Sequence, residues 1–72
     1  MKSMTGLQRD TFNAIRSHQE RHGYPPTRAE LALQFDVNPN AIQDRLKAMA
    51  KKGLIALVPG TARGIKITWF GE

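Results

Sequence analysis

Apolar residues recur every three or four positions in three successive segments of the chain, which is the spacing of one face of an α-helix. The first segment runs from about Thr5 to Arg21. Thr5 followed by Gln8 fits a capping box, in which each side chain binds the backbone amide of the other residue. The positions expected to face inward are Leu7, Thr11, Phe12, Ile15 and His18. A helix beginning at Thr5 is therefore predicted.

A second helix follows a clear interruption. The segment 22–26 contains Gly23 and two prolines, which can turn the chain and disfavour helix. Thr27-Arg28-Ala29-Glu30 is a second capping box that opens a short helix ending near Asp36. Its inward positions are Leu31, Ala32 and Phe35. Only a tight turn separates it from Asn38, so the second and third helices should cross steeply, as in a helix-turn-helix.

The third helix, over residues 38–52, has the strongest signals. Asn38 can cap it, Pro39 has a preset φ for its first position, and Gly53 can close it in the left-handed conformation. The positions expected in the core are Ile42, Leu46 and Met49. The outward positions are Asn40, Ala41, Gln43, Asp44, Lys47 and Lys51. This outward mixture of amides, a carboxylate and lysines is suited to reading base edges and contacting phosphates.

After Gly53 the pattern changes to that of strands. Residues 54–58 form an apolar run too short for a helix, and residues 59–64 have loop composition. Ile65, Ile67 and Trp69 then alternate with polar residues, as in a half-buried strand. Three helices and a C-terminal β-hairpin predict an α+β, mainly helical fold: a winged helix-turn-helix, formed as a single domain over residues 1–72.

Composition narrows the class of protein. The 72 residues include no cysteine, so one small core must hold the fold without disulfides. No apolar signal segment or membrane-spanning run is present, and we expect a cytoplasmic protein with no membrane partner. Ser3 and Ser17 lack partners for nucleophilic catalysis, and no third metal ligand stands near the two histidines, His18 and His22. We expect no enzymatic activity, no metal and no cofactor.

Positive charge is concentrated in the last part of the chain. The formal net charge is +5, yet the first 44 residues balance five basic against five acidic residues. Residues 45–71 contain no acid, and their basic residues are Arg45, Lys47, Lys51, Lys52, Arg63 and Lys66. A patch of one sign is typical of a polyanion binder. The preference of a helix C-terminus for cations explains only Lys51 and Lys52.

Several of these motifs together resemble the DNA-binding domain of the LexA repressor family. The matching segments are Pro25-Pro26-Thr27-Arg28-Ala29-Glu30, Pro39-Asn40-Ala41, Leu46-Lys47-Ala48, Lys52-Gly53 and Arg63-Gly64-Ile65. The resemblance implies a winged helix that reads operator DNA in the major groove through its third helix. It also implies repression of transcription, in that family mostly of DNA-damage (SOS) response genes. The expected partner is double-stranded DNA, with a homodimer on a palindromic operator.

The chain departs from the family pattern at three places. The turn before the third helix is one residue shorter, with Asp36 in place of a glycine, and Gln43 and Asp44 replace two glutamates. Family members also carry a second, self-cleaving serine/lysine peptidase domain that dimerises, and this sequence stops before one. We therefore expect neither the self-cleavage nor the family's operator sequence to carry over.

The residues predicted to read bases lie at the start of the third helix: Asn38, Asn40, Ala41, Gln43 and Asp44. Asn40 and Gln43 can each pair with adenine through two hydrogen bonds. Ala41 can pack on a thymine methyl group, and Asp44 can accept from a cytosine amine. In the alternative interpretation, Asn40 is an ordinary first-turn residue and Asp44 a solvated charge.

The residues predicted to contact the DNA backbone are Thr27, Arg28, Arg45, Lys47, Lys51, Lys52 and Arg63. Arg28 faces the positive end of a helix dipole, a conflict that a bound phosphate would remove. Its alternative is an ion pair with a nearby acid. Arg63, in the predicted wing, can lie beside a phosphate or in a narrow minor groove, or be an exposed arginine on a mobile loop.

Trp69 and Phe70 can form a dimer contact, although Trp69 continues the inward alternation and is expected in the core.

A rival hypothesis is a winged helix of phage or plasmid type that docks on a protein partner instead of DNA. Salt distinguishes the two hypotheses, because the affinity of a DNA binder falls steeply with salt, whereas a docking module binds no duplex.

Overall fold

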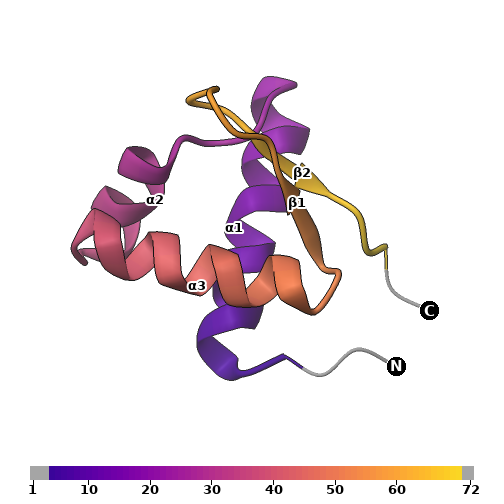
Figure 1. The fold of residues 1–72 in the computed structure, drawn as a ribbon. Helices are drawn as coiled ribbons and strands as arrows, with labels where there is room; N and C mark the ends of the chain where they lie inside the picture. Colours follow the sequence, from indigo (N-terminus) through magenta and orange to yellow (C-terminus); the bar gives the residue numbers. More distant parts are fainter. Residues whose placement is uncertain (1–3, 71–72) are drawn as a thin grey trace.

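The computed structural model describes residues 4–70 (Figure 1). The elements are α1 (Gly6–His22), α2 (Arg28–Phe35), α3 (Pro39–Lys51), β1 (Ile55–Leu57) and β2 (Ile65–Ile67). Three helices followed by an antiparallel hairpin confirm the predicted winged helix-turn-helix. Ser3, considered above, lies outside the described residues. No helix within residues 4–70 is both long enough and apolar enough to cross a membrane.

The first two helices begin at the predicted capping boxes. The Thr5 hydroxyl accepts from the Gln8 amide at 3.1 Å, and Gln8 Oε1 accepts from the Thr5 amide at 3.2 Å. Thr27 and Glu30 form the same reciprocal pair at 3.0 and 2.8 Å. Each box satisfies two amides that the helix itself leaves without acceptors. Local sequence therefore decides where both helices start.

The turn between α2 and α3 is short and contains an unusual backbone conformation. Asp36 follows α2 with φ 54° and ψ 49°, and it is the one non-glycine residue with positive φ within residues 4–70. Asn38 then caps α3, and Pro39 occupies its first turn. The turn directs α3 across α2, as expected for a helix-turn-helix (Figure 1). Gly53 has φ 79°, in agreement with its predicted role after the helix.

The core lies where the three helices and the hairpin meet. Its buried apolar residues are Phe12, Ile15, Leu31, Ala32, Ile42, Leu46, Met49, Leu54, Ile55 and Ile65. The predicted register of α3 is confirmed, since its three inward side chains are completely buried. The inward placement of Leu7 was wrong, because this side chain is 61% exposed. Gln8 is buried in the first turn of α1 instead, while the predicted inward position of Thr11 is confirmed.

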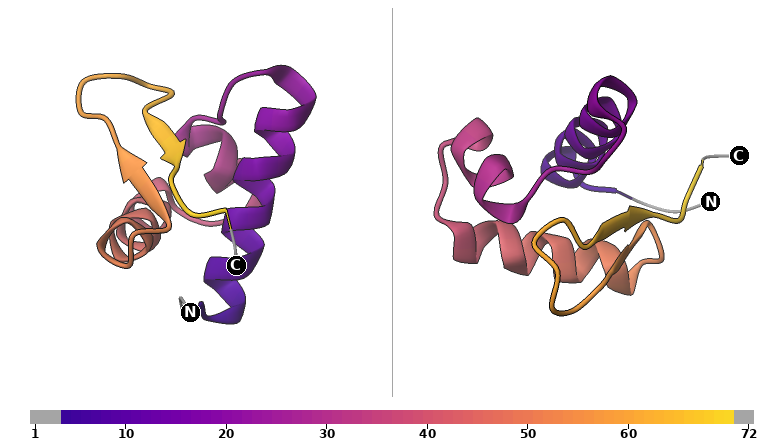
Figure 2. Two further views of the ribbon diagram at one scale, coloured as in Figure 1. Left: turned by 90° about the vertical axis from the view of Figure 1, so that its right-hand side faces the viewer. Right: turned by 90° about the horizontal axis from the view of Figure 1, so that it is seen from above.

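The hairpin completes the core and forms the wing. Ile55 pairs with Ile67, and Leu57 with Ile65. β2 ends before Trp69, yet that ring packs edge-on against Phe12 with centroids 5.7 Å apart, which confirms its place at the core. The loop of residues 58–64, here called the wing loop, lies on the same side of the molecule as α3, with α1 on the opposite side (Figure 2).

Candidate nucleic-acid interface

The N-terminal half of α3 presents the predicted base-reading residues to solvent. Asn38, Asn40, Ala41 and Asp44 are exposed, and Gln43 is partly exposed. The side chains of Asn40, Gln43 and Asp44 form no hydrogen bond or ion pair with any residue between 4 and 70. Their donors and acceptors are therefore available to base edges. The buried stripe on the other side of α3 holds the helix in place.

Asn38 has a local structural task. Its Oδ1 accepts a hydrogen bond from the Asn40 amide at 2.8 Å, which satisfies one of the unpaired amides at the start of α3. The side-chain NH₂ group of Asn38 keeps its two donors for another partner. Asn38 is thus suited to contact DNA as a donor, while its acceptor holds the helix terminus.

Lys47 and Lys51 are the exposed cations of α3. Both side chains project from the helix that carries the predicted base-reading residues, and neither forms an ion pair within residues 4–70. Because no acid neutralises them, their ammonium groups retain their full attraction for phosphate. They extend the reading face toward the C-terminus of α3 as a basic surface.

Two other basic residues of this region that were predicted to contact DNA turn toward α1 instead. Arg45 Nη1 donates to the Thr11 hydroxyl at 3.0 Å, and the Arg45 guanidinium lies over the Phe35 ring at 5.7 Å. Lys52 Nζ donates to Gln8 Oε1 at 2.6 Å. These contacts orient α3 on α1. The sequence analysis did not predict these two contacts. Gln8 and Thr11 are polar residues on the buried side of α1, and buried polar groups require hydrogen-bond partners.

Arg28 lies in the first turn of α2 with an unused donor. Its Nε is buried and has no hydrogen-bond partner within the described part of the chain. No acid between residues 4 and 70 forms an ion pair with it, which contradicts the alternative considered above. Because this Nε is buried, a phosphate contact would have to come from the other guanidinium nitrogens, which form no hydrogen bond with residues 4–70, and the helix N-terminus beside them favours an anion.

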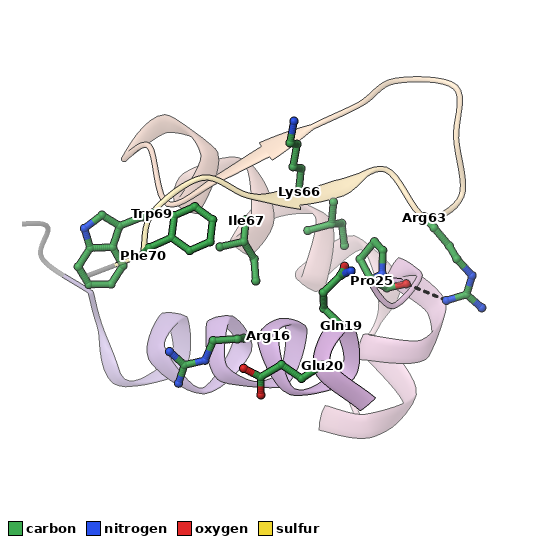
Figure 3. Close-up of a pocket in the computed structure, with 10 residues that line it drawn as sticks. Arg16, Gln19, Glu20, Pro25, Arg63, Lys66, Ile67, Trp69 and Phe70 are labelled. Atoms are coloured by element: carbon green, nitrogen blue, oxygen red, sulfur yellow. Dashed lines mark hydrogen bonds between the residues drawn. The ribbon is translucent and has the colours of Figure 1, made fainter. Parts of the chain in front are cut away.

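Arg63 lies near the C-terminal end of the wing loop, and its side chain is held by contacts with residues of and before α2. Its Nη1 and Nη2 donate to the two carboxylate oxygens of Glu30 at 2.8 and 3.2 Å. Nη1 also donates to the Pro25 carbonyl at 2.8 Å (Figure 3). The Tyr24 ring centroid lies 4.4 Å from the guanidinium carbon. Arg63 therefore has internal partners within the described residues, while its contact with DNA stays a prediction.

Comparison with known proteins agrees with this geometry. The family model of the LexA DNA binding domain matches residues 1–64, which include all three helices. The chain belongs to the LexA DNA-binding domain family. A curated relative, the LexA repressor of Erwinia tasmaniensis, is 46% identical over 68 residues, 93% of this chain. The aligned part is 34% of that relative, so the chain spans about a third of its length.

Family membership establishes that this LexA domain binds DNA, and it confirms the resemblance drawn from the motifs. The matched range contains the whole of α3 and ends at Gly64, immediately after Arg63. The exposed face of α3 that is predicted to read bases therefore lies within the family's DNA-binding unit.

A concave surface of the LexA domain lies apart from the predicted reading face. A groove of about 560 Å³ separates α1 from β2, and Pro25, Ile67 and Trp69 supply its apolar lining (Figure 3). Arg63 borders it, but no other predicted DNA contact does. This groove is distinct from the surface that α3 presents to DNA.

The rings of the two histidines of α1 pack against each other. The ring centroids of His18 and His22 are 4.4 Å apart. His18 Nδ1 is within 2.9 Å of the Tyr24 carbonyl oxygen, and its Nε2 lies 3.9 Å from Glu30 Oε1. Within the described LexA residues, no cluster of three His, Cys, Asp or Glu side chains is arranged to hold a metal ion.

Proposed function

We propose that this LexA domain recognises a specific duplex sequence by inserting the N-terminal half of α3 into the major groove. The supporting observation is the row of solvent-facing polar side chains at residues 40, 43 and 44, which have no partner within residues 4–70. Asn40 and Gln43 can each form paired hydrogen bonds with adenine, and Asp44 can accept from cytosine. Asn38 and Ala41 lie beside them and contribute a donor and a thymine-methyl contact.

The DNA backbone is held on both sides of this row. Lys47 and Lys51 follow it along α3, and Thr27 with Arg28 lies at the N-terminus of α2, where amides and dipole favour a phosphate. These residues contribute affinity without reading sequence. Arg45 and Lys52, whose side chains are bonded to α1, orient α3 and add positive potential near the same surface.

We propose that the domain represses transcription by occupying an operator in the cytoplasm; the Erwinia relative is itself a repressor. A single copy of so small a reading surface holds DNA weakly. Two copies on adjacent half-sites of a palindrome gain affinity through their joint binding, so we propose a homodimer on the operator.

Selection of bound sequences from a random duplex pool tests the proposal. Asn40→Ala and Gln43→Ala should each relax the preference at one base position, with a loss of about 1 to 3 kcal/mol on the selected site and little on random duplex. Lys47→Ala is the matched control on the same helix, and it should weaken all duplexes alike. An unchanged preferred sequence in both amide variants would contradict base reading by this face.

The salt dependence of binding provides an independent test. With Arg28, Lys47 and Lys51 as the cations that neutralise phosphates, log affinity should fall with log salt at a slope of about −3 per copy. A module that docks on a protein would bind no duplex at any salt concentration. A slope near zero would therefore exclude the proposed interface.

A further inference from the structure

The wing is bonded to the helix-turn-helix through one arginine. Arg63 precedes Gly64 at the end of the wing loop, and its guanidinium contacts Glu30, the Pro25 carbonyl and the Tyr24 ring together. All three partners lie in or just before α2, more than 30 residues earlier in the chain. Arg63 is thus the point at which the wing meets the start of α2.

Glu30 connects this contact to the fold of α2. Its Oε1 accepts from the Thr27 amide at 2.8 Å, as the capping box requires, and from Arg63 Nη1 at 2.8 Å. The same carboxylate therefore determines where α2 begins and where the wing sits. His18 Nε2, 3.9 Å away, adds a neighbour from α1.

The wing loop itself leaves Arg63 little freedom of direction. Gly64 is buried, and a β-carbon at this position would clash with the Val58 carbonyl oxygen and approach Thr61 at 3.0 Å. Val58 also donates its amide to the Gly64 carbonyl at 2.7 Å. This close approach of the two ends of the loop sets the position from which the Arg63 side chain leaves the backbone.

We infer that Arg63 is a positioning residue, which holds the wing against the N-terminus of α2 through Glu30 and makes no phosphate contact of its own. Arg63 and Glu30 neutralise each other, so a phosphate would have to displace a carboxylate bound by two hydrogen bonds. A wing that is already ordered in the free protein loses little conformational entropy when DNA binds, and this favours affinity. The inference rests on the proposed DNA-reading function of α3.

Two single substitutions distinguish positioning from direct contact. Glu30→Gln keeps the capping box, since glutamine serves there as Gln8 does in α1, but it removes the charge that holds Arg63. Positioning predicts that Glu30→Gln and Arg63→Ala each weaken binding to the selected duplex by about three- to tenfold, with the salt slope unchanged. Direct contact predicts that Arg63→Ala makes the slope shallower by about one unit, and that Glu30→Gln strengthens binding by freeing Arg63.

The double variant and a charge control complete the experiment. The combined Glu30→Gln and Arg63→Ala variant should bind no more weakly than either single variant, because both break one interaction. Lys66→Ala removes the same charge from the exposed face of β2 and leaves the pair intact. A loss with Lys66→Ala equal to that with Arg63→Ala would reduce the effect to net charge and overturn the inference.

Hydrogen exchange supplies a readout that does not depend on DNA. Amides of the wing loop, residues 58–64, should exchange faster in Glu30→Gln while those of α3 do not, and unchanged wing exchange would overturn the inference. Failure of this inference is separable from failure of the proposed function. If Asn40→Ala changes the selected sequence while Glu30→Gln and Arg63→Ala leave binding unaltered, only the positioning role is refuted.

Discussion

Arg45 donates a 3.0 Å hydrogen bond to the hydroxyl of Thr11, and this bond links α3, the helix predicted to read DNA, to α1. Thr11 is completely buried, and its hydroxyl donates in turn to the Leu7 carbonyl at 2.8 Å. The Arg45 guanidinium also packs over Phe35 at the end of α2. One side chain of α3 thus contacts both other helices, which makes the orientation of α3 a property of the whole helical unit.

Thr11→Val should lower the free energy of unfolding by about 1 to 3 kcal/mol, because it preserves the shape of the side chain but leaves an Arg45 donor without its acceptor. Urea unfolding measures this change. Ser17→Ala, at an exposed position of α1, should stay within about 0.5 kcal/mol of the parent. A Thr11→Val protein as stable as the parent would show that Arg45 finds another partner at no cost.

Leu46→Ala should lower the free energy of unfolding by about 2 to 5 kcal/mol, since Leu46 is 0% exposed and its truncation leaves a cavity. Thermal melting detects the change. Its neighbour Lys47 is exposed, so Lys47→Ala should melt like the parent while binding duplex less tightly. Equal melting of the two variants would contradict the packing of α3.

Asp36→Gly should raise the free energy of unfolding by about 0.5 to 1 kcal/mol. Asp36 has φ 54°, a conformation that is unfavourable for a residue with a β-carbon. We expect the relief of this strain in the folded state to exceed the entropic cost of ordering glycine, which is more flexible in the unfolded chain. Asp36→Asn is the control for charge, because asparagine tolerates the same conformation, and its stability should change little. If Asp36→Gly were the less stable protein, local hydrogen bonding by the carboxylate would outweigh the backbone preference.

Stability should decline in acid partly through Glu30. The hydrogen bond from Arg63, followed by that from the Thr27 amide, lowers the pKa of Glu30 from 4.5 to about 2, and the nearby His18 acts in the same direction. A carboxylate whose pKa is lower in the folded state stabilises the fold above pH 4.5 and loses that contribution as the pH falls toward 2. Glu30→Gln should therefore show a weaker pH dependence of unfolding over this window. Identical pH profiles for parent and variant would contradict this role.

The short-range features of the fold were predictable from sequence. Capping boxes at Thr5 and Thr27, together with Pro39 after Asn38, mark the helix starts because their bonds join residues no more than three positions apart. The spacing of the buried residues on α3 identified its core face and so its exposed reading face. Periodicity placed Thr11 correctly on the buried side of α1, but the inward placement of Leu7 failed, since periodicity alone did not show that Gln8 would be buried and Leu7 exposed.

The direction of the charged side chains was decided by tertiary structure. Arg45, Lys52 and Arg63 were predicted to contact DNA from their charge, yet each binds a polar group of an earlier helix. These contacts join residues 34, 44 and 33 positions apart, so no local pattern encodes them. A long flexible cation can point to solvent or to a neighbouring element, and only the crossing of the helices and the hairpin brings an acceptor within reach. Sequence therefore determined which residues are charged and which helix is predicted to read DNA, while packing decided which of those charges hold that helix in place.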